Sequence, residues 1–127
     1  MTNVTESDAK TATVQRIFCA ERAVEYVPSP REANSGFALS TKGLKPINGL
    51  RHPPAGGTTG WYIWSGERFS DAPDFFAPVH TGHIYDDYPE LVKLLGLPPG
   101  YRFLLADDYL DVWYDASLKW GTEYTGH

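Results

Sequence analysis

The stretch GWYIWSGE, residues 60–67, carries the strongest structural signal in this sequence. Bulky apolar side chains occupy consecutive positions at its centre, so both faces of an extended strand would carry them. Such a strand either lies centrally in a sheet, buried on both faces, or presents an aromatic face to a partner. Trp61 and Ile63 share one face, and we predict that Trp61 is buried there. Tyr62 and Trp64 share the other face and are candidate anchors for a partner.

Other segments also have the pattern of strands. Short extended runs are predicted over 37–39 and 50–52, separated by an irregular connection. Residues 101–105 and 109–114 alternate around a polar turn, which is typical of a β-hairpin. Together with residues 61–64, these segments predict a mainly antiparallel sheet.

Two helices are predicted. The clearer one begins at Asp87, whose side chain can cap free amides, with Glu90 at the spacing of a capping box, and it ends at Gly96. The second is predicted over 14–27, where apolar residues recur at helical spacings, although 17–20 could instead form a short strand.

The chain of 127 residues has the length of one domain. Residues 1–13 are polar and have no hydrophobic period, so we expect them to form a disordered tail. For residues 14–127 we predict a single α+β domain, in which a mainly antiparallel sheet has one or two helices packed on a face.

Charge and composition exclude several classes of protein. Eleven Lys and Arg against 16 Asp and Glu give a net charge of −5, which disfavours binding to nucleic acid. The single cysteine, Cys19, cannot form an internal disulfide or a zinc site, and this suits a reducing compartment. No run of about 18 apolar residues and no export signal is visible, so we expect a cytoplasmic protein without a membrane partner.

Few positions suit catalysis or metal binding. His80, His83 and Asp86 are spaced by three residues, which would suit a metal ion on a regular helix. The predicted helix begins only at Asp87, so we expect no metal, no other cofactor and no catalytic residue. A small hydrolase-like enzyme that uses His80 and His83 remains an alternative.

Acidic residues gather in the loop after residue 66, before the predicted helix and in the hairpin. A solvated surface explains any one of these clusters, whereas together with interleaved aromatic side chains they predict an acidic patch that docks on a basic partner. Trp113 stands between two aspartates and is a further candidate anchor. The candidate partner-binding residues are Tyr62, Trp64, Glu67, Asp71, Asp74, Asp107, Asp108, Asp111 and Trp113.

Three segments in order, FALSTKGL (37–44), GWYIWSGE (60–67) and LPPGYRFL (97–104), resemble the Immunity protein 33 domain family. The resemblance covers about 36–115, and the element Gly-Trp-x-x-x-Ser-Gly-Glu is its most specific part. In that family an acidic pair is expected after this element, where this chain has Arg68, and a basic residue before it, for which Arg51 is the candidate.

The resemblance implies a small bacterial protein, associated with polymorphic-toxin loci, that neutralises a cognate toxin by binding it, and it implies no catalytic residues. We therefore expect an immunity protein whose acidic surface occludes the basic active site of a toxin. Besides the enzyme, a self-associating scaffold module is an alternative, because exposed aromatic side chains also build homodimers.

Overall fold

The computed structural model describes residues 4–70, 72 and 74–120. Within these residues a six-stranded sheet forms the centre of the protein, in the order β4-β1-β3-β2-β5-β6. The strands are β1 (Asn34–Phe37), β2 (Ile47–Arg51), β3 (Thr58–Ser65), β4 (Ala77–His80), β5 (Tyr101–Ala106) and β6 (Tyr109–Tyr114). The helices are α1 (Val4–Glu21) and α2 (Thr81–Asp87), and the 3-10 segments are η1 (Leu39–Thr41), η2 (Pro89–Gly96) and η3 (Ala116–Trp120).

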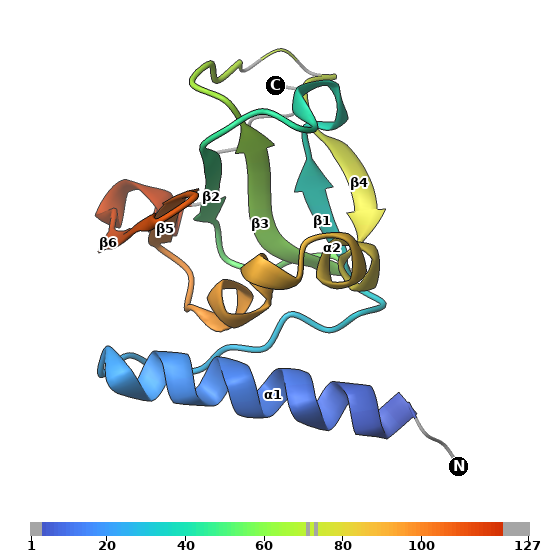
Figure 1. Cartoon of the computed structure of the whole chain (residues 1–127), viewed down its shortest axis with the longest axis vertical. Coiled ribbons are helices and arrows are strands. Elements are labelled where there is room, and N and C mark those ends of the chain that lie inside the picture. The colour runs from blue at the N-terminus through green and yellow to red at the C-terminus, as the bar shows by residue number, and fades with distance from the viewer. Residues whose placement is uncertain (1–3, 71, 73, 121–127) are drawn as a thin grey trace.

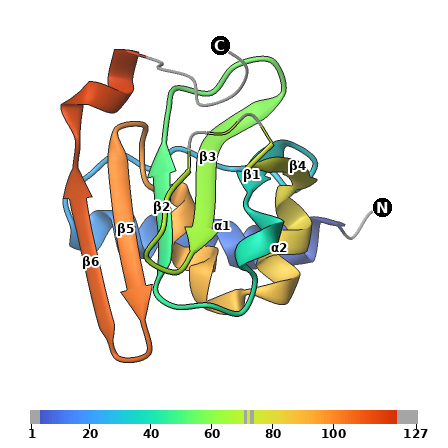
Figure 2. The same ribbon diagram turned by 90° about the horizontal axis from the view of Figure 1, so that it is seen from above.

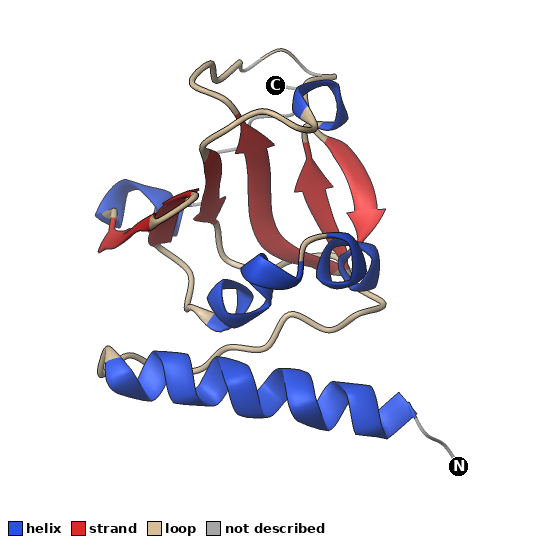
Figure 3. Ribbon diagram, in the orientation of Figure 1, coloured by secondary structure: helices blue, strands red, loops and turns tan. Residues whose placement is uncertain are grey.

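The arrangement of these elements confirms the predicted fold class, α+β with a mainly antiparallel sheet. Among the described strands β1 runs parallel to β3, and every other neighbouring pair is antiparallel. The segments α2 and η2 lie on one side of the sheet, and α1 packs against η2 further out (Figures 1 and 3). None of the described helices is both long enough and apolar enough to cross a membrane.

The strand β3 lies in the middle of the sheet, as the central stretch of the sequence predicts. Trp61 and Ile63 are 1% and 0% exposed, and both belong to the core between sheet and helices. Trp61 donates a hydrogen bond from Nε1 to the Leu95 carbonyl at 3.1 Å and packs on Phe103. The prediction that Trp61 is buried is confirmed, and Trp61 joins the sheet to η2.

The hairpin is also confirmed, while the two shorter strands are displaced from their predicted limits. β5 and β6 pair from Tyr101↔Tyr114 to Ala106↔Tyr109. β1 ends at Phe37, where a strand was predicted to begin, because the chain turns directly into η1.

The first helix begins earlier than the hydrophobic pattern predicts. α1 starts at Val4 and so includes residues that were expected to belong to the tail, and the strand alternative for 17–20 is wrong. Gln15 is 1% exposed and donates from Nε2 to the Tyr85 hydroxyl and the Val92 carbonyl. Buried contacts of this kind hold α1 against η2, although Val14 and Ile17 of the same helix are exposed.

The second helix is divided at the residue where it was predicted to begin. α2 ends at Asp87, and η2 begins at Pro89. Proline disfavours helical geometry in the residue before it, and Tyr88 accordingly has φ −131° and ψ 71°. Asp87 therefore closes one helix instead of capping the next. Leu91, Leu94 and Leu95 of the predicted helix are each 0% exposed, whereas Val92 is partly buried.

Candidate functional site

Two of the predicted acidic regions lie at the same end of the sheet. Ser65 at the end of β3 and Leu105 near the end of β5 both pair with Ile47 at the start of β2. The loop after β3 and the turn of the hairpin therefore lie on either side of the start of β2 (Figure 2). Sequence separation hides this proximity, which depends on the order of the strands.

Lys45 lies between these two regions. Its Nζ donates a hydrogen bond to Oδ1 of Asp107 at 2.8 Å, and this bond lowers the pKa of the Asp107 carboxyl below its usual value. Lys45 also lines, together with Glu67 and Arg68, an open groove of about 620 Å³. Basic side chains thus interrupt the acidic surface at this end of the sheet.

The other acidic candidates are accessible to a partner. Glu67, Asp74, Asp108 and Asp111 are exposed, and none of them forms an ion pair with another residue in the described part of the chain. Asp71 lies outside the described residues.

Trp64, a candidate anchor from the sequence, is buried. Its side chain is 5% exposed, because Phe69 and Phe76 cover it with ring centroids at 5.0 and 6.2 Å. The loop between β3 and β4 folds back over this face of the sheet and builds a second, smaller core there. Proline interrupts this loop, so the sequence pattern did not show which way its phenylalanines point.

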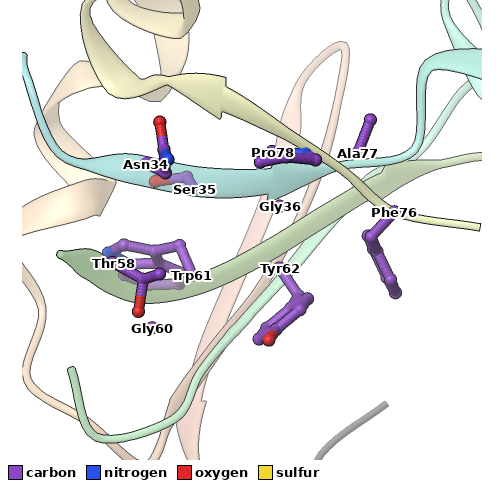
Figure 4. A pocket seen from close by; sticks show the side chains of 10 residues that line it. All are labelled: Asn34, Ser35, Gly36, Thr58, Gly60, Trp61, Tyr62, Phe76, Ala77 and Pro78. Carbon is purple, nitrogen blue, oxygen red and sulfur yellow. The ribbon is translucent and has the colours of Figure 1, made fainter. Parts of the chain in front are cut away.

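Tyr62 is half-buried and lines a pocket of about 200 Å³ beside β1 and β4 (Figure 4). Its ring meets that of Phe76 edge-on, with centroids 5.1 Å apart. Gly36 leaves room for this ring, because a Cβ there would lie 2.8 Å from Cδ2 of Tyr62. No residue that lines the pocket is acidic, basic, histidine or cysteine, so the pocket has no acid–base pair.

The outer face of the hairpin carries two exposed aromatic side chains, while the exposed ring of Tyr114 lies on the other face of β6. Tyr109, Asp111 and Trp113 alternate along β6 and share the face that points away from the helices. Tyr109 is 56% and Trp113 is 36% exposed. We call these three residues the hairpin patch. The sequence pattern missed Tyr109, although its period-two spacing from Asp111 and Trp113 was a signal for it.

Arg102 fixes one end of the hairpin patch. Its position in β5 is directly opposite Trp113, and its guanidinium carbon lies 5.6 Å from the centre of the Trp113 ring. The same guanidinium donates to Oδ2 of Asp115 at 3.1 Å. Trp113 is therefore both exposed and held in place, a combination that suits a binding anchor.

Arg51, the basic residue that the family resemblance suggests, is internal. It is 0% exposed, and its guanidinium donates four hydrogen bonds, each to a main-chain carbonyl. The acceptors are the carbonyls of Thr59, Val27, Leu97 and Pro28. Burial lowers the pKa of Arg51 to about 10, so it stays charged at neutral pH. Arg51 thus joins β3, the segment after α1 and the chain after η2.

His80 and His83 lie on the surface near the other edge of the sheet. The helix around them begins at Thr81, so the prediction that it starts only at Asp87 is wrong. Both side chains are exposed, and their ring centroids are 5.9 Å apart. In the described part of the chain no group of three His, Cys, Asp or Glu side chains is placed to hold a metal ion.

Comparison with known proteins gives one result. A family model for the Imm33-like domain matches residues 14–115. Neither the curated proteins nor the solved structures yield a match. The matched residues contain all six described strands and the hairpin patch. Because the match covers most of the chain, this protein belongs to the Imm33-like family.

Proposed function

We propose that this protein is an immunity protein that binds a cognate protein toxin and occludes its active site without any chemistry of its own. Membership of the Imm33-like family supports this function. The observation that carries the proposal is the hairpin patch, where exposed aromatic side chains stand on a rigid pair of strands beside unpaired carboxylates.

The charge of the protein suits a basic partner. The net charge is −5, and Asp108 and Asp111 form no ion pair with another described residue. Their field would speed the approach of a basic surface and disfavour acidic competitors. Asp107 contributes less to this field, because Lys45 neutralises it at short range.

The aromatic side chains would supply the affinity. Binding energy in protein interfaces concentrates in a few well-packed aromatic and arginine side chains. Trp113 is stacked against Arg102, so little conformational freedom would be lost when a partner covers it. Tyr109 extends the same face toward the acidic turn. We propose Trp113 and Tyr109 as the contact anchors in place of Trp64.

The same proposal places the protein in the cytoplasm. Cys19 is 1% exposed and lies near Gly96, so its thiol is shielded, and the burial raises its pKa. A protein with one buried thiol requires no oxidising compartment to fold.

The test is rescue of growth. The candidate toxin encoded beside this gene is expressed in bacteria with the parent protein or with the double variant Tyr109→Ala/Trp113→Ala. We expect the parent to restore growth and the double variant to lose most of this protection. The control is Leu39→Ala, which removes an apolar side chain that is 48% exposed and lies next to β1, away from the hairpin.

Two results would count against the proposal. If the parent neither binds nor neutralises the toxin, toxin inhibition is wrong. If the double variant protects as well as the parent and the Leu39→Ala control, inhibition stands but the hairpin patch is not the contact surface.

A further inference from the structure

We propose that β6 accepts an extended basic segment of the toxin as an additional strand of the sheet. This inference rests on the proposed function and specifies how the toxin binds. β6 is the last strand on its side of the described sheet, and both views show it at the outer edge (Figures 1 and 2). An open edge of this kind is a template for pairing with another chain.

The main chain of β6 presents a regular set of hydrogen-bonding groups. The main-chain amide of Asp115 donates a hydrogen bond to the Gly100 carbonyl at 2.7 Å. This bond shows that the main-chain groups of Asp115 point toward β5. Along an antiparallel strand, residues whose main-chain N–H and C=O groups point to one neighbour alternate with residues whose groups point the other way. The main-chain groups of Leu110, Val112 and Tyr114 therefore point away from β5. None of these three makes a main-chain hydrogen bond outside the hairpin to another described residue.

The side of β6 that faces the helices borders a groove of about 450 Å³, whose lining combines apolar side chains with Glu21, Arg22 and Lys93. Leu110 borders it, and Val14 and Ile17 of α1 border it from below. These two α1 residues are 44% and 55% exposed, which is unusual for large apolar side chains on neighbouring turns of one helix face. A strand added to β6 would direct every second side chain toward this groove.

The opposite side of β6 carries the hairpin patch. The side chains of the added strand that lie on this side must therefore differ from those that face the groove. Asp111 stands between Tyr109 and Trp113, so a side chain of the added strand on this face would lie beside a carboxylate and two aromatic rings. Lysine and arginine suit both neighbours, through ion pairing and through cation–π contact. The occupant is therefore an extended segment in which basic and apolar residues alternate.

A second copy of this chain fits the same edge poorly. If two β6 strands paired antiparallel with Tyr109 opposite Trp113 of the second copy, Asp111 would lie opposite Asp111 of that copy. Like charges directly opposite one another destabilise a pair of strands, and each copy carries a net charge of −5. Asp111 thus protects the edge against self-association while it favours a basic strand.

The experiment uses the full-length protein and a short peptide in which lysine and valine alternate. Binding is followed by NMR, and the exchange of main-chain amides is measured with and without peptide. We expect the amides of Leu110, Val112 and Tyr114 to exchange at least about tenfold more slowly when the peptide is bound. The inward-facing amides of Asp111 and Trp113 are the internal control, because they already face β5.

Matched peptides separate main-chain pairing from side-chain attraction. Two peptides have the same sequence but are N-methylated at alternate residues, one along each edge; each keeps the charge and the side chains but cannot pair through its methylated edge. We expect the form whose methyl groups lie on the pairing edge to bind at least about tenfold more weakly. A peptide in which glutamate replaces lysine should not bind, because it meets Asp111 with like charge.

Strand addition is overturned if the unmethylated peptide does not bind at millimolar concentration, or if both methylated forms bind as well as it does. Either result would leave toxin inhibition intact, because growth rescue tests that function independently. Val112→Pro, which removes an outward-facing N–H from an edge strand, should weaken binding of the lysine peptide in the same way. The methylated peptides keep the test valid if this variant does not fold.

Discussion

The strands β3 and β6 are both rich in aromatic residues, yet the tryptophans of β3 are buried and the tryptophan of β6 is exposed. In β3, Trp61 is 1% and Trp64 is 5% exposed, whereas in β6 Trp113 is 36% exposed. β3 has a neighbouring strand on each edge and is covered on both faces. β6 has one neighbour, and the described residues cover only its helix-facing side. Aromatic content alone therefore does not distinguish a core strand from a binding strand.

The same contrast applies to the arginines of neighbouring strands. Arg51 in β2 is completely buried and is held by main-chain carbonyls. Arg102 in β5 is partly exposed and pairs with Asp115 at the border of the hairpin patch. The inner residue stabilises the fold, and the outer one positions Trp113. The predictions below test this difference between the inner and outer strands, from the largest expected effect to the smallest.

The largest loss of stability is expected for Arg51→Met. The change removes the donor from four main-chain carbonyl oxygens, two of them in fully buried hydrogen bonds, and we expect the free energy of unfolding to fall by roughly 5 kcal/mol. Denaturant unfolding measures it. The control is Arg102→Met, for which we expect a loss of about 1 kcal/mol or less, since its ion pair is partly exposed. Equal losses in the two variants would show that Arg51 has no special structural role.

Trp61→Ala should destabilise the protein by about 3 to 5 kcal/mol, because it leaves a cavity in the main core and removes the hydrogen bond to Leu95. Trp113→Ala is the matched change in the outer strand, and we expect it to lower stability by less than about 1 kcal/mol while it weakens toxin binding. Thermal unfolding of both variants makes the comparison. An unchanged melting temperature for Trp61→Ala would contradict the assignment of this side chain to the core.

Charge reversal at Glu67, Asp108 and Asp111, each to Lys, should slow association with the toxin by at least about tenfold. The effect should shrink as salt is added, because screening weakens attraction at long range. Stopped-flow or surface plasmon resonance measurements at several ionic strengths give the rates. Reversal of Glu25, Glu32 and Asp87, which are exposed elsewhere, alters the net charge equally. If both triple variants associate equally fast, net charge and not the acidic surface near the hairpin controls the encounter.

The smallest effect concerns pH and Asp115. Hydrogen bonds from Ser117, followed by the interaction with Arg102, lower the pKa of the Asp115 carboxyl below 3.8 in the folded protein. A lowered pKa means that the folded state favours the ionised form, so this contribution is complete above about pH 4 and disappears as the pH falls through the folded-state pKa. Asp115→Asn should therefore cost up to about 1 kcal/mol at pH 7, and this cost should shrink as the pH falls below about 4. Urea unfolding across this pH range is the measurement.

The predictions that held were those set by local pattern. The alternation of the hairpin and the bulk of residues 61–64 allow few other structures, and both strands were confirmed. The predictions that failed depended on a neighbour. α1 extends back to Val4, and the added residues include Asp8, whose Oδ1 lies 3.7 Å from Nε of Arg31, a contact that no period in the tail could show. The break at Tyr88 follows from Pro89, because proline disfavours helical geometry in the residue before it even where it suits the first turn of the next helix.

The candidate site shows the same division between local pattern and tertiary structure. The sequence by itself determined that the hairpin carries aspartates around Trp113, since period-two alternation and a polar turn are local properties. Only the tertiary structure decided that Trp64 is covered while Trp113 and Tyr109 are exposed. The reason is that exposure depends on which strands become neighbours and on where the loop of Phe69 and Phe76 folds. These contacts join residues distant in sequence, and the pattern of any single segment does not specify them.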